Sequence, residues 1–148
     1  MKLLSTSSSF VLIALFPLLT AFSPSNRTEL KAAVNKWVVN RTEALITYGG
    51  AIGQWDVSKV DDMTGMFCGD DFYWGCDCGD LCEHFQAFDD DISGWDISKV
   101  TSMWDIFADA KAFNQNLSSW NTSSVTSMMG MFNGAISFNG SLSNFDTS

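Results

Sequence analysis

The sequence predicts an α/β solenoid in which each 25-residue repeat contributes one short helix and one short strand. Three observations support this fold class. Segments of the chain match at a fixed offset of 25 residues, each match carries an apolar stripe with helical spacing, and an extended stretch follows each stripe. A unit of this size cannot bury its apolar side chains alone, so stacked copies must cover one another.

The repeat is defined by two segments that begin with tryptophan, WDISKVTSM at Trp95–Met103 and WNTSSVTSM at Trp120–Met128. An earlier copy, WDVSKV, begins at Trp55. It lies 40 residues before Trp95, so it carries an insertion of 15 residues. The predicted repeats span 54–93, with a cysteine-rich insertion near 68–82, then 94–118 and 119–143, and a fourth repeat starts at 144–148.

Within one repeat, Val100, Met103, Phe107 and Ala110 follow i, i+3, i+7 and i+10 spacing, which predicts a short amphipathic helix. The segment 113–122 is interpreted as a turn followed by a short extended stretch. The predicted repeat core comprises Trp55, Val60, Met63, Phe67, Phe88, Ile92, Trp95, Val100, Met103, Phe107, Phe113, Leu117, Trp120, Val125, Met128, Phe132, Phe138 and Leu142.

Asp89, Asn114 and Asn139 occupy one repeat position, directly after a phenylalanine. Such side chains can turn inward and bond backbone groups from one coil to the next. They are equally typical of ordinary turns. The inward ladder predicts that Asn139 is buried.

The N-terminus predicts a signal peptide at 1–21, because the apolar run Phe10–Leu19 is too short to span a bilayer. We therefore expect a secreted or surface protein with no transmembrane span in the mature chain. TAFSP at Thr20–Pro24 also resembles the cleavage motif of bipartite plastid presequences, so import into a plastid is the alternative.

Residues 22–53 are assigned to a linker and an N-terminal capping helix. The apolar positions from Thr28 to Tyr48 form an approximate helical stripe, made of Leu30, Val34, Trp37, Val38, Leu45 and Ile46. Stacked repeats need a terminal element that covers the first coil. A helix that binds a partner is the alternative.

Acidic residues are concentrated in one part of the chain. The net charge is -9, and 14 of the 17 acidic residues lie between Asp56 and Asp109. An acidic chain is a poor partner for nucleic acid, which binds clustered Lys and Arg. The aromatic content of 14% argues against a disordered acidic tail.

All four cysteines, Cys68, Cys76, Cys78 and Cys82, lie in one 15-residue window. In a secreted chain they form two disulfides, with three possible connectivities. A metal site with His84 is the alternative, but the spacing does not match paired zinc knuckles.

Asn26, Asn40, Asn116, Asn121 and Asn139 begin N-x-S/T sequons. The first four are candidate glycosylation sites. The inward ladder would leave Asn139 unmodified.

No catalytic motif is present, and the single histidine is His84, so we expect no enzymatic activity. We also expect no cofactor, apart from the calcium considered next. A calcium-dependent binding module is the alternative function, because carboxylates supply the oxygen ligands that calcium prefers. Its candidate ligands are Asp70, Asp71, Asp77 and Asp80, or Asp89, Asp90 and Asp91.

The pattern W-D-[VI]-S-x-V-x-x-M-x-x-[MI]-F, followed by F-[ND]-x-x-[IL]-S-x-W, resembles the repeat of BspA-like leucine-rich repeat surface proteins, first catalogued in mycoplasmas as a domain of unknown function. The match covers 54–148. The resemblance implies a secreted or surface-attached repeat protein without enzymatic activity that mediates adhesion or binds a protein or glycan. It does not define the oligomeric state.

Overall fold

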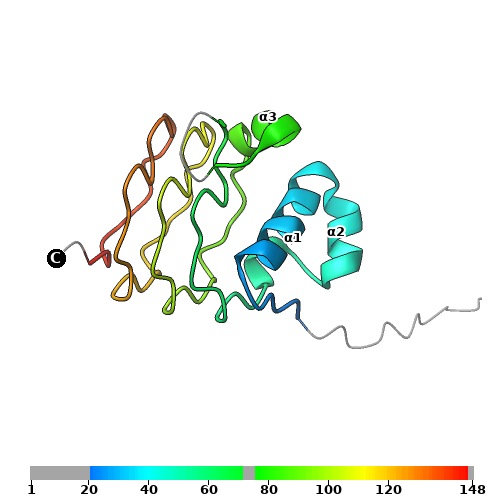
Figure 1. The fold of residues 1–148 in the computed structure, drawn as a ribbon, viewed down its shortest axis with the longest axis horizontal. Helices are drawn as coiled ribbons and strands as arrows, with labels where there is room; N and C mark the ends of the chain where they lie inside the picture. The colour runs from blue at the N-terminus through cyan, green and yellow to red at the C-terminus, as the bar shows by residue number, and fades with distance from the viewer. Residues whose placement is uncertain (1–20, 72–75, 147–148) are drawn as a thin grey trace, which may run out of the picture.

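Three coils of backbone stack side by side, and two helices cover the N-terminal end of the stack (Figure 1). This computed structural model describes residues 21–71 and 76–146. The predicted signal peptide, apart from Ala21, therefore lies outside the described residues, as does part of the cysteine-rich insertion. The elements in chain order are α1 (Arg27–Val39), α2 (Arg41–Tyr48), η1 (Ile52–Gln54), η2 (Gly79–Leu81) and α3 (Cys82–Gln86).

The predicted α/β solenoid is wrong. The described residues contain no strand, and only two isolated parallel bridges, Asp62–Ser102 and Ser102–Ser127, connect the coils in the manner of a sheet. The short helix expected in each repeat is also missing. Among the described residues after Gln54, helices occur only at η2, within the cysteine-rich insertion, and at α3, which continues past the insertion to Gln86.

Each coil instead carries a run of tight turns, here called the turn strip, at 63–69, 103–109 and 128–134. In the second strip, some backbone N–H groups donate to the next coil and others donate to carbonyls within the strip itself. Met103, Asp105, Phe107 and Asp109 donate to carbonyls of the third coil at 2.7–3.0 Å. Between them, Ile106 donates back to Met103, and the same pattern recurs in the first coil.

The backbone dihedrals explain why the turn strip is not a helix. An α-helix needs negative φ throughout. The second strip has positive φ at Asp105 (52°) and Asp109 (51°), and glycines take this conformation at the related positions Gly65, Gly130 and Gly134. Side chains still project inward at helix-like intervals, which is why the apolar stripe suggested a helix.

The core lies inside the coils and is dominated by stacked aromatic rings. Two columns of phenylalanines run along the stack, with ring centroids 5.5–6.0 Å apart from one coil to the next. The columns are Phe67, Phe107 and Phe132, and Phe88, Phe113 and Phe138. The indole N–H groups of Trp95 and Trp120 donate to Ile52 and Ile92 in the preceding layer, at 2.8 and 3.2 Å.

Every predicted core residue from Trp55 to Trp120 is buried. The later positions pack against the core but are only partly buried, because no described coil covers the third one. They are Val125, Met128, Phe132, Phe138 and Leu142.

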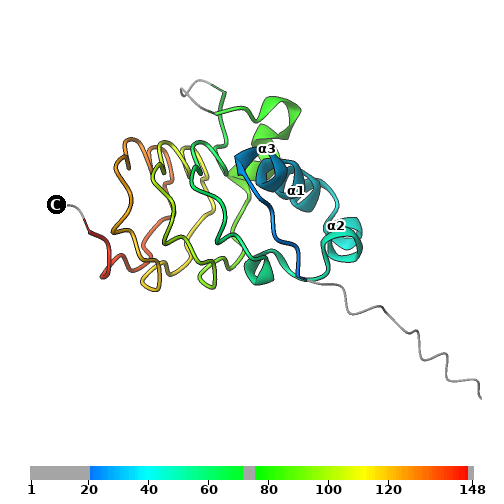
Figure 2. The same ribbon diagram turned by 60° about the horizontal axis from the view of Figure 1, so that its bottom comes forward.

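The segment 28–48 is two helices rather than one. Asn40 ends α1 and begins α2, where its side-chain oxygen accepts from the backbone N–H of Glu43 at 3.1 Å. Both views place α1 against the first coil and α2 outside it (Figures 1 and 2). Of the predicted stripe, Leu45 and Ile46 are therefore exposed, because they lie on the outer helix.

Helix α1 provides hydrogen-bond donors for the first turn strip. In the second and third coils, carbonyls of the turn strip accept hydrogen bonds from backbone N–H groups of the preceding coil. The first strip has no preceding coil, so Arg27 donates to the carbonyl of Thr64 and Lys31 to those of Gly65 and Met66, at 2.7–3.2 Å. These backbone acceptors are thus bonded although they lie at the end of the stack.

The Asp89 position forms a ladder on the outside of the stack. The side-chain oxygen of Asp89 accepts from the backbone N–H of Asn114 at 2.8 Å, and that of Asn114 accepts from Asn139 at 2.7 Å. The coil-to-coil bonds of the ladder hypothesis therefore exist. The predicted burial is wrong, because all three side chains are exposed and stay at the turn.

Candidate functional site

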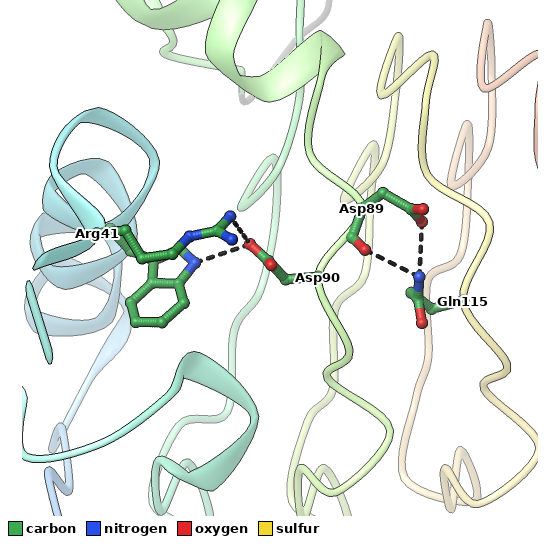
Figure 3. Close-up of polar contacts among 5 residues, drawn as sticks. Arg41, Asp89, Asp90 and Gln115 are labelled. Carbon is green, nitrogen blue, oxygen red and sulfur yellow. Dashed lines mark hydrogen bonds and ion pairs between the residues drawn. The ribbon is translucent and has the colours of Figure 1, made fainter.

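Asp90 lies where the helices meet the first coil, and it connects them. Its Oδ2 atom accepts from Trp37 Nε1 at 2.8 Å and from an Arg41 guanidinium nitrogen at 2.7 Å (Figure 3). The Arg41 guanidinium carbon also lies 5.2 Å from the centroid of the Trp37 ring. Asp90 Oδ1 accepts from no described residue.

The repeat register shows that Asp90 is adapted to this junction. Gln115 is its equivalent in the second coil, and it bonds backward to Asp89 through Nε2, at 2.8 and 2.9 Å (Figure 3). Both side chains bond to the preceding layer. That layer is a coil for Gln115 but a helix pair for Asp90, which explains the acidic residue opposite Arg41.

Two grooves flank Asp90. The first, of about 450 Å³, lies between η1 and the second half of the first coil. The second, of about 370 Å³, lies between the helices and α3. The first groove is lined by Trp37, Ala51, Ile52, Gly53, Gln54, Asp90, Asp91, Ser93 and Gly94. The second is lined by Val38, Arg41, Glu83, His84, Ala87, Phe88 and Asp90.

Direct backbone contact fixes the walls of the first groove. A Cβ atom on Gly53 would lie 2.3 Å from the carbonyl oxygen of Asp91, so only glycine fits there. Gln54 Oε1 accepts from the N–H of Ala51 at 3.1 Å, and no described residue accepts from its Nε2 group. The groove is therefore preformed and presents both a donor and acceptors.

Asp91 is held as a charged acceptor in this groove. Its Oδ1 accepts from the backbone N–H of Ser93 at 2.9 Å. Hydrogen bonds from the Ser93 side chain and backbone lower the pKa of Asp91 below its usual value. The buried ring of Trp37 contributes to the wall of this groove.

The proposed calcium ligands do not converge on one point. Asp89 bonds Asn114 and Gln115, Asp90 bonds the helices, and Asp91 closes its own turn. Asp71 accepts from the backbone N–H groups of Cys78 and Gly79 at 2.7–3.1 Å. Asp70, Asp77 and Asp80 are exposed in the insertion.

One set of three potential metal-ligating side chains comes together in the described part of the chain: Asp71, Cys78 and Cys82. Both cysteines are oxidised, because a disulfide joins Cys78 to Cys82. Metal ligation by cysteine requires the thiolate, so this set does not make a thiolate metal site.

The chain matches the family described as Mycoplasma protein of unknown function, DUF285, over residues 28–73 and 76–148. It belongs to this family. The mycoplasma-type repeat named in the sequence resemblance is therefore confirmed. No curated protein and no solved structure matches the chain.

The prediction of two disulfides is confirmed in this DUF285 chain. Cys68 pairs with Cys76, and Cys78 pairs with Cys82. Directly after the insertion, His84 lies exposed on α3. No helix in the described ranges is long and apolar enough to cross a membrane.

The four candidate glycosylation sites lie at turns and helix starts of the DUF285 fold. Asn26 and Asn40 are N-cap residues, while Asn116 and Asn121 accept from the N–H groups of Ser118 and Ser123. All four are exposed. Their side-chain oxygens have a structural role with or without a glycan. Glycosylation at these positions therefore stays a prediction.

Sequence reasoning missed the polar residues of the junction. Arg41 and Trp37 lie 49 and 53 residues from Asp90 in the chain, so no local motif links them. The repeat gave no signal at this position either, because its pattern leaves the residue type open. Asp90 stands where the next two repeats carry Gln115 and Gly140.

Proposed function

We propose that this DUF285 protein is a secreted or surface-associated, non-catalytic binding protein, functionally related to BspA-like surface proteins. We further propose that it binds a glycan in the first groove beside Asp90. One observation carries this proposal: a preformed groove opens beside Asp90 and Asp91 and offers side-chain acceptors together with one donor.

The chemistry of the groove suits a ligand rich in hydroxyl groups. Asp91 and the second oxygen of Asp90 can accept hydrogen bonds, and Gln54 can donate one. Bonds to charged acceptors are the stronger kind. A few sugar hydroxyls would match this mixed set of donors and acceptors.

The size of the groove favours a glycan over a folded protein. A volume of about 450 Å³ lies within the range of small-ligand sites. Protein interfaces instead bury roughly 800 Å² on each partner. The groove is suited to one or a few sugar units at the end of a larger glycan.

Asp91→Asn tests this proposal. The equivalent residue in the second coil is Asn116, which makes the same turn, so the variant keeps the local structure and removes one charge. Isothermal titration against neutral oligosaccharides selected from a glycan panel should show about tenfold weaker binding, the loss expected for one charge-assisted hydrogen bond.

Asp96→Asn is the matched control. Asp96 closes the same kind of turn, with Ser98, and its third-coil equivalent is Asn121. Asp96 does not line the groove, so the Asp96→Asn variant should bind the oligosaccharides with the affinity of the wild type. The absence of any glycan ligand on the panel, or equal losses in the two variants, would contradict the proposal.

A further inference from the structure

Asp90 lines both of the grooves described above, so the two grooves meet at this residue. Its Oδ2 atom accepts from Trp37 and Arg41, whereas its Oδ1 atom accepts from no described residue (Figure 3). An oligosaccharide that extends beyond the first groove therefore meets the second groove at a carboxylate with one oxygen available.

The charged side chains that line the two grooves are mostly carboxylates. The first groove is lined by Asp90 and Asp91, and the second by Asp90 and Glu83. Arg41 is the one lysine or arginine among the lining residues, and its charge is paired with Asp90 at 2.7 Å. With His84 neutral, three carboxylates and one guanidinium give the two grooves a net charge of -2.

Glu83 is the available carboxylate of the second groove. It lies exposed in the first turn of α3, and no described residue donates to its side chain. Val38, Ala87 and Phe88 line the same groove and offer only apolar side chains. A ligand group that bonds Glu83 must therefore bring its own donor, and a positively charged donor makes the stronger bond.

The carboxylates of the grooves do not converge on one metal ion. Among the described residues, only Asp71, Cys78 and Cys82 bring three potential ligand atoms within 4.8 Å of one another. Calcium needs about six to eight oxygens around one point. The negative charges are instead spread over the two grooves, so a ligand with several separate positive charges matches them better than a single cation.

We infer that the two grooves together bind an oligosaccharide of amino sugars whose amines are free and protonated, an inference that rests on the proposed glycan site. Its ammonium groups meet Asp90 Oδ1 and Asp91 in the first groove and Glu83 in the second, while its hydroxyls bond Gln54. The surrounding charge attracts such a ligand, because 14 of the 17 acidic residues lie between positions 56 and 109.

The probe is a glucosamine tetrasaccharide, and the matched neutral control is its N-acetylated form, which has the same length and linkage. At about pH 7, amino groups with a pKa near 8 are mostly protonated. Isothermal titration should show about tenfold tighter binding of the glucosamine tetrasaccharide, because several ammonium–carboxylate pairs contribute together. This difference should shrink as salt is added.

Glu83→Gln tests the second groove by itself. Glutamine keeps the shape of the side chain and the helix propensity of this exposed position, so the fold is retained. The variant should bind the glucosamine tetrasaccharide about threefold more weakly and the acetylated form as tightly as the wild type does. Asp61→Asn removes one charge at an exposed carboxylate outside both grooves and should change neither affinity.

The outcomes separate this inference from the proposed function. Binding of a neutral glycan that Asp91→Asn weakens, without preference for the glucosamine tetrasaccharide, would overturn the inference and leave the proposed function intact. No binding of any glycan would overturn both. Equal losses in Glu83→Gln and Asp61→Asn would show a diffuse effect of charge and also overturn the inference.

Tetralysine is the control for positive charge without a sugar. If it binds as tightly as the glucosamine tetrasaccharide and responds equally to Glu83→Gln, the grooves recognise a cationic peptide and the inference is overturned. A preference for the glucosamine tetrasaccharide over both controls, reduced by Glu83→Gln alone of the two charge variants, supports it.

Discussion

Lys31 is a buried cation that completes the first coil. Its ammonium group donates to the carbonyls of Gly65 and Met66, and lies 4.2 Å from the centroid of the Phe85 ring. Burial is the main cause that lowers the pKa of Lys31 to about 8, and the nearby charge of Arg27 lowers it further. The hydrogen bonds to the Gly65 and Met66 carbonyls therefore stabilise the charged ammonium group of Lys31 where little solvent reaches it.

This shift predicts a pH dependence of stability. Between pH 8 and the usual lysine pKa of about 10.5, the unfolded chain binds more protons at this site than the folded chain. The unfolding free energy of the wild type should therefore rise with pH in this window. Relative to Lys31→Met, which lacks the group, the wild type should gain stability from pH 8 to 10 in denaturant titrations.

Lys59→Met is the control for this experiment, because Lys59 is an exposed lysine of the first coil. Its unfolding free energy should run parallel to that of the wild type across the window. A parallel curve for Lys31→Met as well would show that Lys31 titrates alike in the folded and unfolded chain.

Single residues differ in how far their roles could be predicted. Four cysteines in a short window predicted two disulfides, because an oxidised secreted chain leaves few alternatives. Their connectivity was not predictable, since all three pairings satisfy the spacing. Asp90 was not identified as a junction residue because its partners come from helices distant in sequence.

At the scale of elements, the turn strip imitates the spacing of a helix. Both structures bring residues three or four apart to one face, so an apolar stripe does not distinguish them. The sign of φ does. Glycines at 65, 130 and 134 were the available signal, but Asp105 and Asp109 hold the same kind of conformation without glycine and obscured it.

Gly130→Ala should be strongly destabilising. Gly130 has φ of 65°, and a Cβ atom there would lie 1.8 Å from Oδ1 of Asp105. Left-handed φ costs alanine roughly 1–2 kcal/mol, and overpacking adds roughly 1–3 kcal/mol. Chemical denaturation should show the sum of both costs.

Asp105→Gly separates the two costs. It removes the carboxylate and restores the residue found at the equivalent position in the first coil, Gly65. The double variant Gly130→Ala/Asp105→Gly should regain the unfolding free energy lost to overpacking. It should still lack the part lost because alanine is strained at a left-handed φ. Strictly additive free energies in this cycle would contradict direct contact between the two sites.

For the whole molecule, stability depends on position in the stack, because each coil contacts only its neighbours. The Phe107 ring stacks between those of Phe67 and Phe132, at 5.5 and 5.6 Å. Among the described residues, Phe132 has a ring of this column on one side only. The second coil is thus packed on both faces, and the third on one.

Phe107→Ala should therefore cost about 3–5 kcal/mol, the usual range for a buried phenylalanine. Phe132→Ala deletes the same atoms from a partly buried site and should cost clearly less. Thermal and denaturant unfolding of the two variants provide the comparison. Equal losses would mean that the third coil is as well covered as the second.

The sequence by itself determined the repeat, its 25-residue offset, most of the core and the oxidised state of the cysteines. These properties depend on composition and spacing along one chain. Only the tertiary structure decided the turn strips, the disulfide connectivity, the two-helix cover and the Asp90 junction. The disulfides pair within the insertion, at separations of 8 and 4 residues. The other features depend on hydrogen bonds or contacts to a neighbouring layer, which is the physical reason that the sequence did not reveal them. A backbone whose donors and acceptors are satisfied by the next coil does not need the internal bonds of a helix or the regular ladder of a sheet.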